Sequence, residues 1–110
     1  MNEVILINSD AMGAPDEKLG RILSGNFLRL LGERETLPEY IIILNGGLRL
    51  ATNDSDTLEH LQRLEERGVK IIICRTCVDY FDIESEIAVG EIDGMVRIID
   101  ILSSHSVLTL

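Results

Sequence analysis

Residues 69–82, VKIIICRTCVDYFD, constrain the fold more than any other stretch of this chain. An apolar run rich in isoleucine begins after Gly68 and ends at Cys74. A continuous run of β-branched residues is typical of a strand that is buried on both faces, as in parallel sheets. We expect the residues after Cys74 to form a loop or short helix, so Cys74 and Cys77 lie where a strand ends. In an open α/β sheet this is where ligands bind.

The rest of the chain alternates between short apolar runs and segments of helical periodicity. The other expected strands are residues 4–8, 39–44, 88–91 and 106–110. Apolar residues at helical spacing predict helices over residues 16–33, with Pro15 as the first helical residue, and up to about Arg67, with Asp56 and Glu59 as a capping box. A further helix is expected after Asp93, with Asp93 as its cap and an inner face made of Met95, Ile98, Ile99 and Leu102.

This order predicts an α/β fold, a three-layer α/β/α sandwich around a five-stranded, mainly parallel sheet. A chain of 110 residues is expected to form a single domain, residues 1–110. In such a fold the strand-to-helix loops lie at one edge of the sheet. We therefore expect residues 8–13, 45–47, 74–77 and 90–91 to converge on one cleft.

Charge and composition exclude several partners. A formal net charge of −9 argues against nucleic acid or an anionic membrane as partner. No apolar run reaches the roughly 18 residues of a membrane span, and the first residues lack the basic region of a signal peptide. Two cysteines in a CxxC pattern, without an export signal, indicate the reducing cytoplasm, and chemistry or metal binding rather than a structural disulfide.

Four interpretations of the cysteines remain open from the residues alone. Cys74 is a small buried hydrophobe, or the pair is a thioredoxin-like dithiol, a zinc site, or a carrier of persulfide sulfur. Both prolines precede the cysteines, which disfavours the thioredoxin architecture, and His60 and His105 are too far away along the chain to complete a zinc site. We expect His105 to be a capping or surface residue, His60 to be solvated, and the chain to hold neither metal nor cofactor.

The motifs together resemble those of the DsrE/DsrF-like family. They are Met12-Gly13 with Asp16 and Leu19-Gly20, Leu44-Asn45-Gly46-Gly47, Cys74-Arg75-Thr76-Cys77-Val78-Asp79-Tyr80 and Ala88-Val89-Gly90-Glu91. The resemblance covers nearly the whole chain and is closest to the DsrE-like C-terminal domain of YedF-type proteins, which are sulfurtransferase-like and linked to selenium metabolism. Arg75, Asp82 and Pro15 stand where many relatives have glycine.

The resemblance implies a parallel sheet in the order 4-3-2-1-5, assembly into trimers or hexamers, and transfer of sulfur from a small TusA-like carrier. It makes Cys74 the persulfide-bearing cysteine and Cys77 the second cysteine of the motif. The cleft around them is expected to include Asn8, Ser9, Met12, Gly13, Asn45, Gly46, Gly47, Arg75 and Thr76.

The hypothesis is therefore a cytoplasmic relay protein for sulfur or selenium, with a solvent-reachable Cys74 of lowered pKa. The alternative is a non-catalytic homo-oligomeric binding or scaffold module, in which Cys74 is buried. A CxxC dithiol redox protein is a third option.

Overall fold

The structure, a computed structural model, describes residues 3–110. Its elements in chain order are β1 (Val4–Ile7), α1 (Glu17–Leu31), β2 (Tyr40–Ile43), the 3₁₀ helix η1 (Asn45–Ala51), α2 (Leu58–Glu66), β3 (Lys70–Cys74), α3 (Arg75–Phe81), the 3₁₀ helix η2 (Glu84–Glu86), β4 (Glu91–Asp93), α4 (Met95–Ser104) and β5 (Val107–Thr109).

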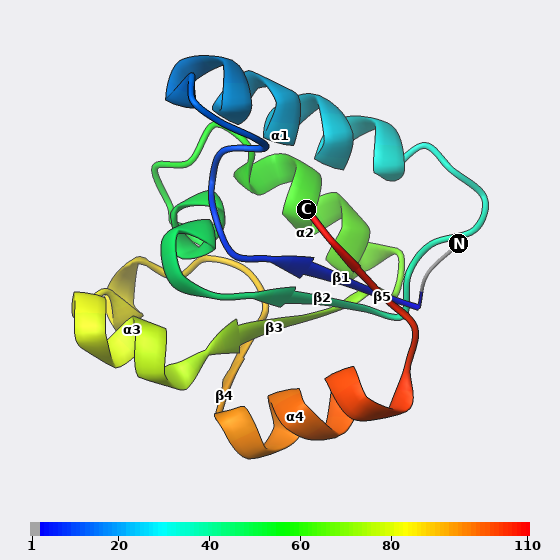
Figure 1. Ribbon diagram of the computed structural model, residues 1–110, viewed down its shortest axis with the longest axis vertical. Helices are drawn as coiled ribbons and strands as arrows, with labels where there is room; N and C mark the ends of the chain where they lie inside the picture. The colour runs from blue at the N-terminus through cyan, green and yellow to red at the C-terminus, as the bar shows by residue number, and fades with distance from the viewer. Residues whose placement is uncertain (1–2) are drawn as a thin grey trace.

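The strands form one five-stranded sheet in the order β4-β3-β2-β1-β5, and every neighbouring pair is parallel. Helices α1 and α2 cover one face and α4 covers the other, while α3 extends from the end of β3 (Figure 1). This confirms the three-layer α/β/α fold and the strand order that the family resemblance implied.

Two apolar clusters fill the space between the layers. The larger one lies between the sheet and helices α1 and α2, and its helix residues include Leu28, Leu31, Leu61 and Leu64. The smaller one lies under α4, where Ile98 and Ile101 pack on Ile42 and Ile72. Because the central strands bury side chains on both faces, isoleucine dominates them, as expected for a sheet covered on both sides.

The structure corrects several boundaries. The fourth strand is Glu91–Asp93 rather than residues 88–91, so Gly90 precedes the strand and does not belong to the cleft edge. Asp93 is a strand residue, and the residue that caps α4 is Gly94. Ile101, not Met95 or Ile99, joins Ile98 on the buried face of that helix, since Met95 and Ile99 are exposed.

Two predicted helix starts are also wrong. Asp16, not a helical Pro15, begins α1 as its N-cap, and its carboxylate accepts a hydrogen bond of 2.8 Å from the Leu19 backbone N–H. Helix α2 begins after Thr57 and shows no side-chain cap, so the expected capping box of Asp56 and Glu59 does not form. The Asp16 cap is the usual way to satisfy one of the free N–H groups of a first helical turn.

Gly20 allows helix α1 to approach the loop that follows β1. A Cβ atom built at Gly20 would lie 2.6 Å from the Ala11 Cβ and 3.1 Å from the Met12 carbonyl oxygen. The Met12 N–H donates a 3.0 Å hydrogen bond to the Gly20 carbonyl, which holds the loop at this distance. The missing side chain at Gly20 is therefore what allows this loop to lie against the helix.

A Gly20→Ala substitution tests this contact. It should lower the free energy of unfolding by about 1–3 kcal/mol, because overpacking against backbone outweighs the helix propensity of alanine. Denaturant titration would measure the change. Gly25→Ala is the matched control in the same helix, where the nearest atom to a new Cβ is the Thr57 methyl at 3.3 Å. A Gly20→Ala protein as stable as wild type would contradict the argument.

Candidate active site at the CxxC edge

Three strand-to-helix connections meet at the carboxyl edge of the sheet. The register pairs Ile7 with Ile43 and Ile43 with Ile73, so β1, β2 and β3 end at the same level. The Leu44 N–H donates to the Ile7 carbonyl at 2.8 Å, and a Cβ built on Gly47 would lie 2.8 Å from that same oxygen. The absence of a side chain at Gly47 thus allows the loop after β2 to fold closely over the end of β1.

Cys74 and Cys77 differ sharply in exposure. Cys74 is the last residue of β3 and the N-cap of α3, and only 1% of its surface is exposed. Cys77 lies in the first turns of α3, is half-buried, and packs against both apolar clusters. The expectation of a solvent-reachable Cys74 is therefore wrong, because the end of an isoleucine-rich strand stays inside the core.

Cys77 is the thiol that faces a cavity. Its Sγ accepts a hydrogen bond of 3.2 Å from the backbone N–H of Asn45. Asn45 has a positive φ of 49° and begins η1 directly after β2. The cavity has a volume of about 430 Å³ and is lined by Asn45, Thr76, Cys77, Tyr80 and Phe81. This arrangement offers a nucleophilic sulfur, one fixed N–H donor and two aromatic walls.

Burial governs the protonation of this thiol. Partial burial raises the pKa of Cys77 above the ordinary thiol value, and the nearby Cys74 thiol raises it further, while the Asn45 N–H acts in the opposite direction. The two thiols are thus close enough to interact, and the raised pKa favours the protonated form of Cys77 in the resting protein.

Arg75 follows Cys74 in the sequence, but its positive charge is engaged by two carboxylates. Its guanidinium donates to Glu84 at 2.7 Å and to Asp79 at 3.2 Å, and these hydrogen bonds raise its pKa. Its charge is therefore compensated on the outer side of α3.

The carboxylate of Asp93 lies beside the end of β3, on the neighbouring strand β4. Asp93 is paired with Cys74 in the register of β3 and β4. Hydrogen bonds from Arg97 and from the Gly94 N–H lower the pKa of Asp93. Arg97 thus favours the ionised form of the Asp93 carboxyl group on the strand next to Cys74, and its guanidinium offsets the negative charge of that carboxylate.

The structure brings together only part of the predicted set. Asn45, Thr76 and Cys77 share the cavity described above, and Gly46 lines a neighbouring one of about 400 Å³ together with Arg49 and Phe81. Among the described residues, Asn8, Ser9, Met12 and Gly13 line neither cavity. Ser9 instead closes its own loop, since its Oγ accepts a 3.1 Å hydrogen bond from the Ala11 N–H.

Tyr80 and Phe81 were not among the predicted site residues, although they follow the cysteine motif directly. Tyr80 is 84% exposed and its ring contacts Phe81 edge-on at 5.4 Å between centroids. A helical reading of residues 75–81 would have placed Tyr80 one turn beyond Cys77 and Phe81 at i+4 from it. The sequence is compatible with either a loop or a short helix after Cys74, and only the helix brings both rings to the side of Cys77.

A larger cavity of about 530 Å³ lies elsewhere, beside α1, η1 and α2. Its lining includes the basic residues Lys18, Arg21, Arg29 and Arg49, together with His60, which the sequence had suggested is solvated. It contains no cysteine, so we place the candidate active site at the CxxC edge.

Comparison with known proteins identifies the family. A sequence model of the DsrE/DsrF-like family matches residues 40–110. This chain is a member of the DsrE/DsrF-like family. The matched range spans the loop after β2 and the CxxC motif, which are the two segments that meet at the Cys77 cavity.

Solved structures support the fold. The ychN protein from E. coli superposes with a TM-score of 0.71 at 21% identity and covers 100% of both chains. MTH1491 from Methanobacterium thermoautotrophicum, a protein of unknown function, gives a TM-score of 0.68 at 17% identity, covering 97% of this chain and 96% of the other. No curated protein matches the chain. In residues 3–110, no helix is both long and apolar enough to cross a membrane.

The rate at which Cys77 is alkylated should report its raised pKa. A thiol whose pKa lies above the ordinary value carries less thiolate at pH 7, so alkylation should be slower than for a free cysteine and should rise with pH past the ordinary thiol range. Iodoacetamide labelling followed by mass spectrometry measures this. Cys77→Ser should abolish the labelling, because Cys74 is buried. Fast labelling at pH 7 that levels off near neutrality would contradict it.

Asp82 occupies the left-handed region that glycine prefers. It follows α3 with φ 54° and ψ 50°. Asp82→Gly should raise the free energy of unfolding by up to about 1 kcal/mol, since the Cβ penalty of this conformation is removed. Asp82→Val should lower it, because a β-branched side chain tolerates positive φ poorly. Thermal unfolding of both variants would show the order, and a Val variant as stable as the Gly variant would contradict it.

Proposed function

We propose that this DsrE/DsrF-like chain relays sulfur, or selenium, as a persulfide formed at the Cys74–Cys77 pair. The observation that carries the proposal is the Cys77 Sγ, which faces a cavity and accepts the Asn45 N–H at 3.2 Å. A hydrogen-bond donor aimed at sulfur stabilises negative charge on it. The family membership supports the same role, and the YedF-type resemblance adds selenium as an alternative cargo.

The transfer is an exchange between sulfur atoms. The receiving cysteine thiolate attacks the outer sulfur of a persulfide on a donor, such as a TusA-like carrier. A new S–S bond forms on this chain as the donor's S–S bond breaks. The donor cysteine leaves as a thiolate and takes up a proton, so no external oxidant or reductant is needed.

The family resemblance and the exposure of the thiols favour different cysteines as the one that carries sulfur. The family resemblance makes Cys74 the sulfur-bearing residue, whereas exposure favours Cys77 as the thiol that a donor meets first. The raised pKa of Cys77 lowers the fraction of thiolate in the resting protein. Asn45 is the group placed to stabilise that thiolate.

Self-association and a cytoplasmic location complete the proposal. Large apolar side chains are exposed on α1 and α4, namely Leu19, Ile22, Leu23, Leu30, Met95, Val96 and Ile99. Exposed apolar surface of this kind is typical of a protein interface. A trimer or hexamer, as the family resemblance implies, would cover it, and free thiols in a CxxC fit a reducing compartment.

A second candidate function rests on the burial of Cys74. A fully buried thiol is inert, and a chain that had kept only the fold would be a non-catalytic, homo-oligomeric binding module. Under that alternative, Cys74 packs as a small hydrophobe among Ile42, Ile72 and Ile98.

Intact-protein mass spectrometry separates the two functions. The protein is incubated with a cysteine desulfurase, cysteine and a TusA-like carrier, and wild type is compared with Cys77→Ser and Cys74→Ser. We expect wild type to gain the mass of a sulfur atom that reductant removes. Cys77→Ser should lose this gain and Cys74→Ser should keep it, while Thr76→Ser serves as a control for the cavity lining.

The other outcomes are also informative. A gain that disappears only in Cys74→Ser would keep the relay and assign the persulfide to Cys74, as the resemblance implies. No gain on any protein, together with a Cys77 that resists alkylation at high pH, would overturn the relay in favour of the binding module.

A further inference from the structure

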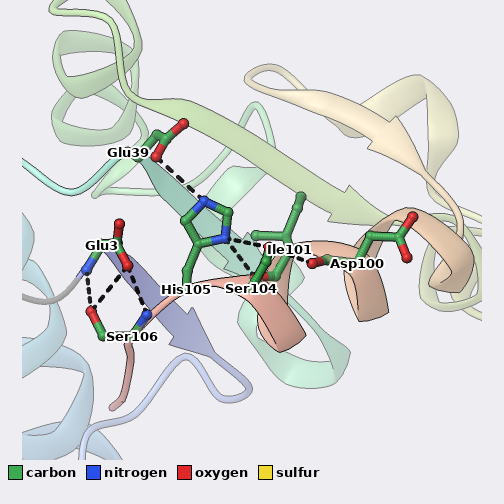
Figure 2. A network of polar contacts seen from close by, with 7 residues as sticks. All are labelled: Glu3, Glu39, Asp100, Ile101, Ser104, His105 and Ser106. Atoms are coloured by element: carbon green, nitrogen blue, oxygen red, sulfur yellow. Dashed lines mark hydrogen bonds and ion pairs between the residues drawn. The ribbon is translucent and has the colours of Figure 1, made fainter.

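The edge of the sheet opposite the cysteines holds a compact group of ligand-type side chains. Glu3, Glu39 and His105 each place one ligand atom so that all three atoms lie within 4.8 Å of one another. Glu3 directly precedes β1, Glu39 directly precedes β2, and His105 ends α4 just before β5 (Figure 2). Three residues far apart in the sequence thus meet at the amino edge of three adjacent strands.

The backbone holds the two glutamates in a fixed relation. The Glu39 N–H donates to the Glu3 carbonyl at 2.7 Å, and the Val4 N–H donates to the Ser106 carbonyl at 3.0 Å. The Glu3 carboxylate is anchored as well, since its Oε1 accepts the Ser106 N–H at 2.9 Å. The relative position of the two glutamates is therefore set by the strand register and by these hydrogen bonds.

The His105 ring is oriented by its second nitrogen. Nδ1 lies 2.8 Å from the Ile101 carbonyl oxygen and 3.0 Å from the Ser104 Oγ. A carbonyl oxygen only accepts, so Nδ1 carries the proton and donates it. The neutral ring then has its lone pair on Nε2. A histidine ring fixed in this way by a backbone carbonyl is the usual arrangement for a metal ligand.

Nε2 points at a carboxylate, as Figure 2 shows. It lies 3.4 Å from the Glu39 Oε2, and the His105 side chain is only 19% exposed. This contact is an ion pair if Nε2 is protonated, and a metal ion held by both side chains would supply the same positive charge. With Glu3 adjacent, the group offers two negative charges and one imidazole, which a single proton on His105 only half neutralises.

We propose that Glu3, Glu39 and His105 bind a divalent transition-metal ion of the zinc type. Imidazole nitrogen with carboxylate oxygen suits zinc better than the hard ions magnesium and calcium, which prefer oxygen alone. Three protein ligands leave a fourth position to water or to a further ligand. The ion joins the starts of β1 and β2 to the end of α4, independently of any sulfur chemistry at the other edge.

Zinc titration of the metal-stripped protein tests the site. Isothermal titration calorimetry with zinc chloride should show one ion per chain, and the melting temperature should rise with zinc. Glu3→Gln, Glu39→Gln and His105→Gln should each weaken zinc binding at least tenfold. Circular dichroism checks that each variant folds, and if His105→Gln does not fold, Glu3→Gln and Glu39→Gln carry the test.

Two controls separate this site from other zinc ligands. His60→Gln removes the other histidine, and Cys77→Ser removes the more accessible thiol, and both should bind zinc as wild type does. Cobalt in place of zinc should give a spectrum without the thiolate charge-transfer band. Wild-type affinity in all three ligand variants, loss of binding in Cys77→Ser, or no zinc binding by wild type would overturn the proposal. The last result would leave a protonated His105 paired with Glu39.

Discussion

The parallel ladder of β1, β2 and β3 is the constraint on which the rest of the structure depends. Its register, Ile7 with Ile43 and Ile43 with Ile73, makes all three strands end at one level. The CxxC motif meets the loop after β2 only because of this alignment. At the other end, the same register brings Glu3 beside Glu39. One set of backbone hydrogen bonds therefore fixes the geometry of both edges.

Burial and polarity compete at the carboxyl end of β3. The isoleucines that stabilise the sheet draw Cys74 into the apolar layer under α4, where a thiolate would be poorly solvated. Cys77, one turn later, sits at the boundary and receives the Asn45 N–H. This edge thus has one sulfur atom buried in the core and one that faces a cavity.

Much of this fold was predictable because its signals are local and strong. The apolar runs ending at Ile7, Ile43 and Cys74 are short and rich in isoleucine, which favours buried strands over helices, and the family resemblance supplied their order. The fourth strand was misplaced because Glu91–Asp93 is a short edge strand of mixed polarity, which periodicity does not reveal. Of the predicted site residues, Asn45, Thr76 and Cys77 line the Cys77 cavity. The sequence did not reveal the depth of Cys74 or the walls formed by Tyr80 and Phe81, since both depend on how α3 continues from the strand. The approach of Glu3, Glu39 and His105 depends on long-range register and left no local pattern.

The contact between Ala11 and Gly20 has a consequence for exchanging parts between relatives. These two positions share a space that admits only one Cβ, so they act as a single steric unit although they belong to a loop and a helix. A loop transplanted from another family member into residues 8–16 would fit here only with a small residue at position 11. Natural variation at either position should therefore be tied to the other.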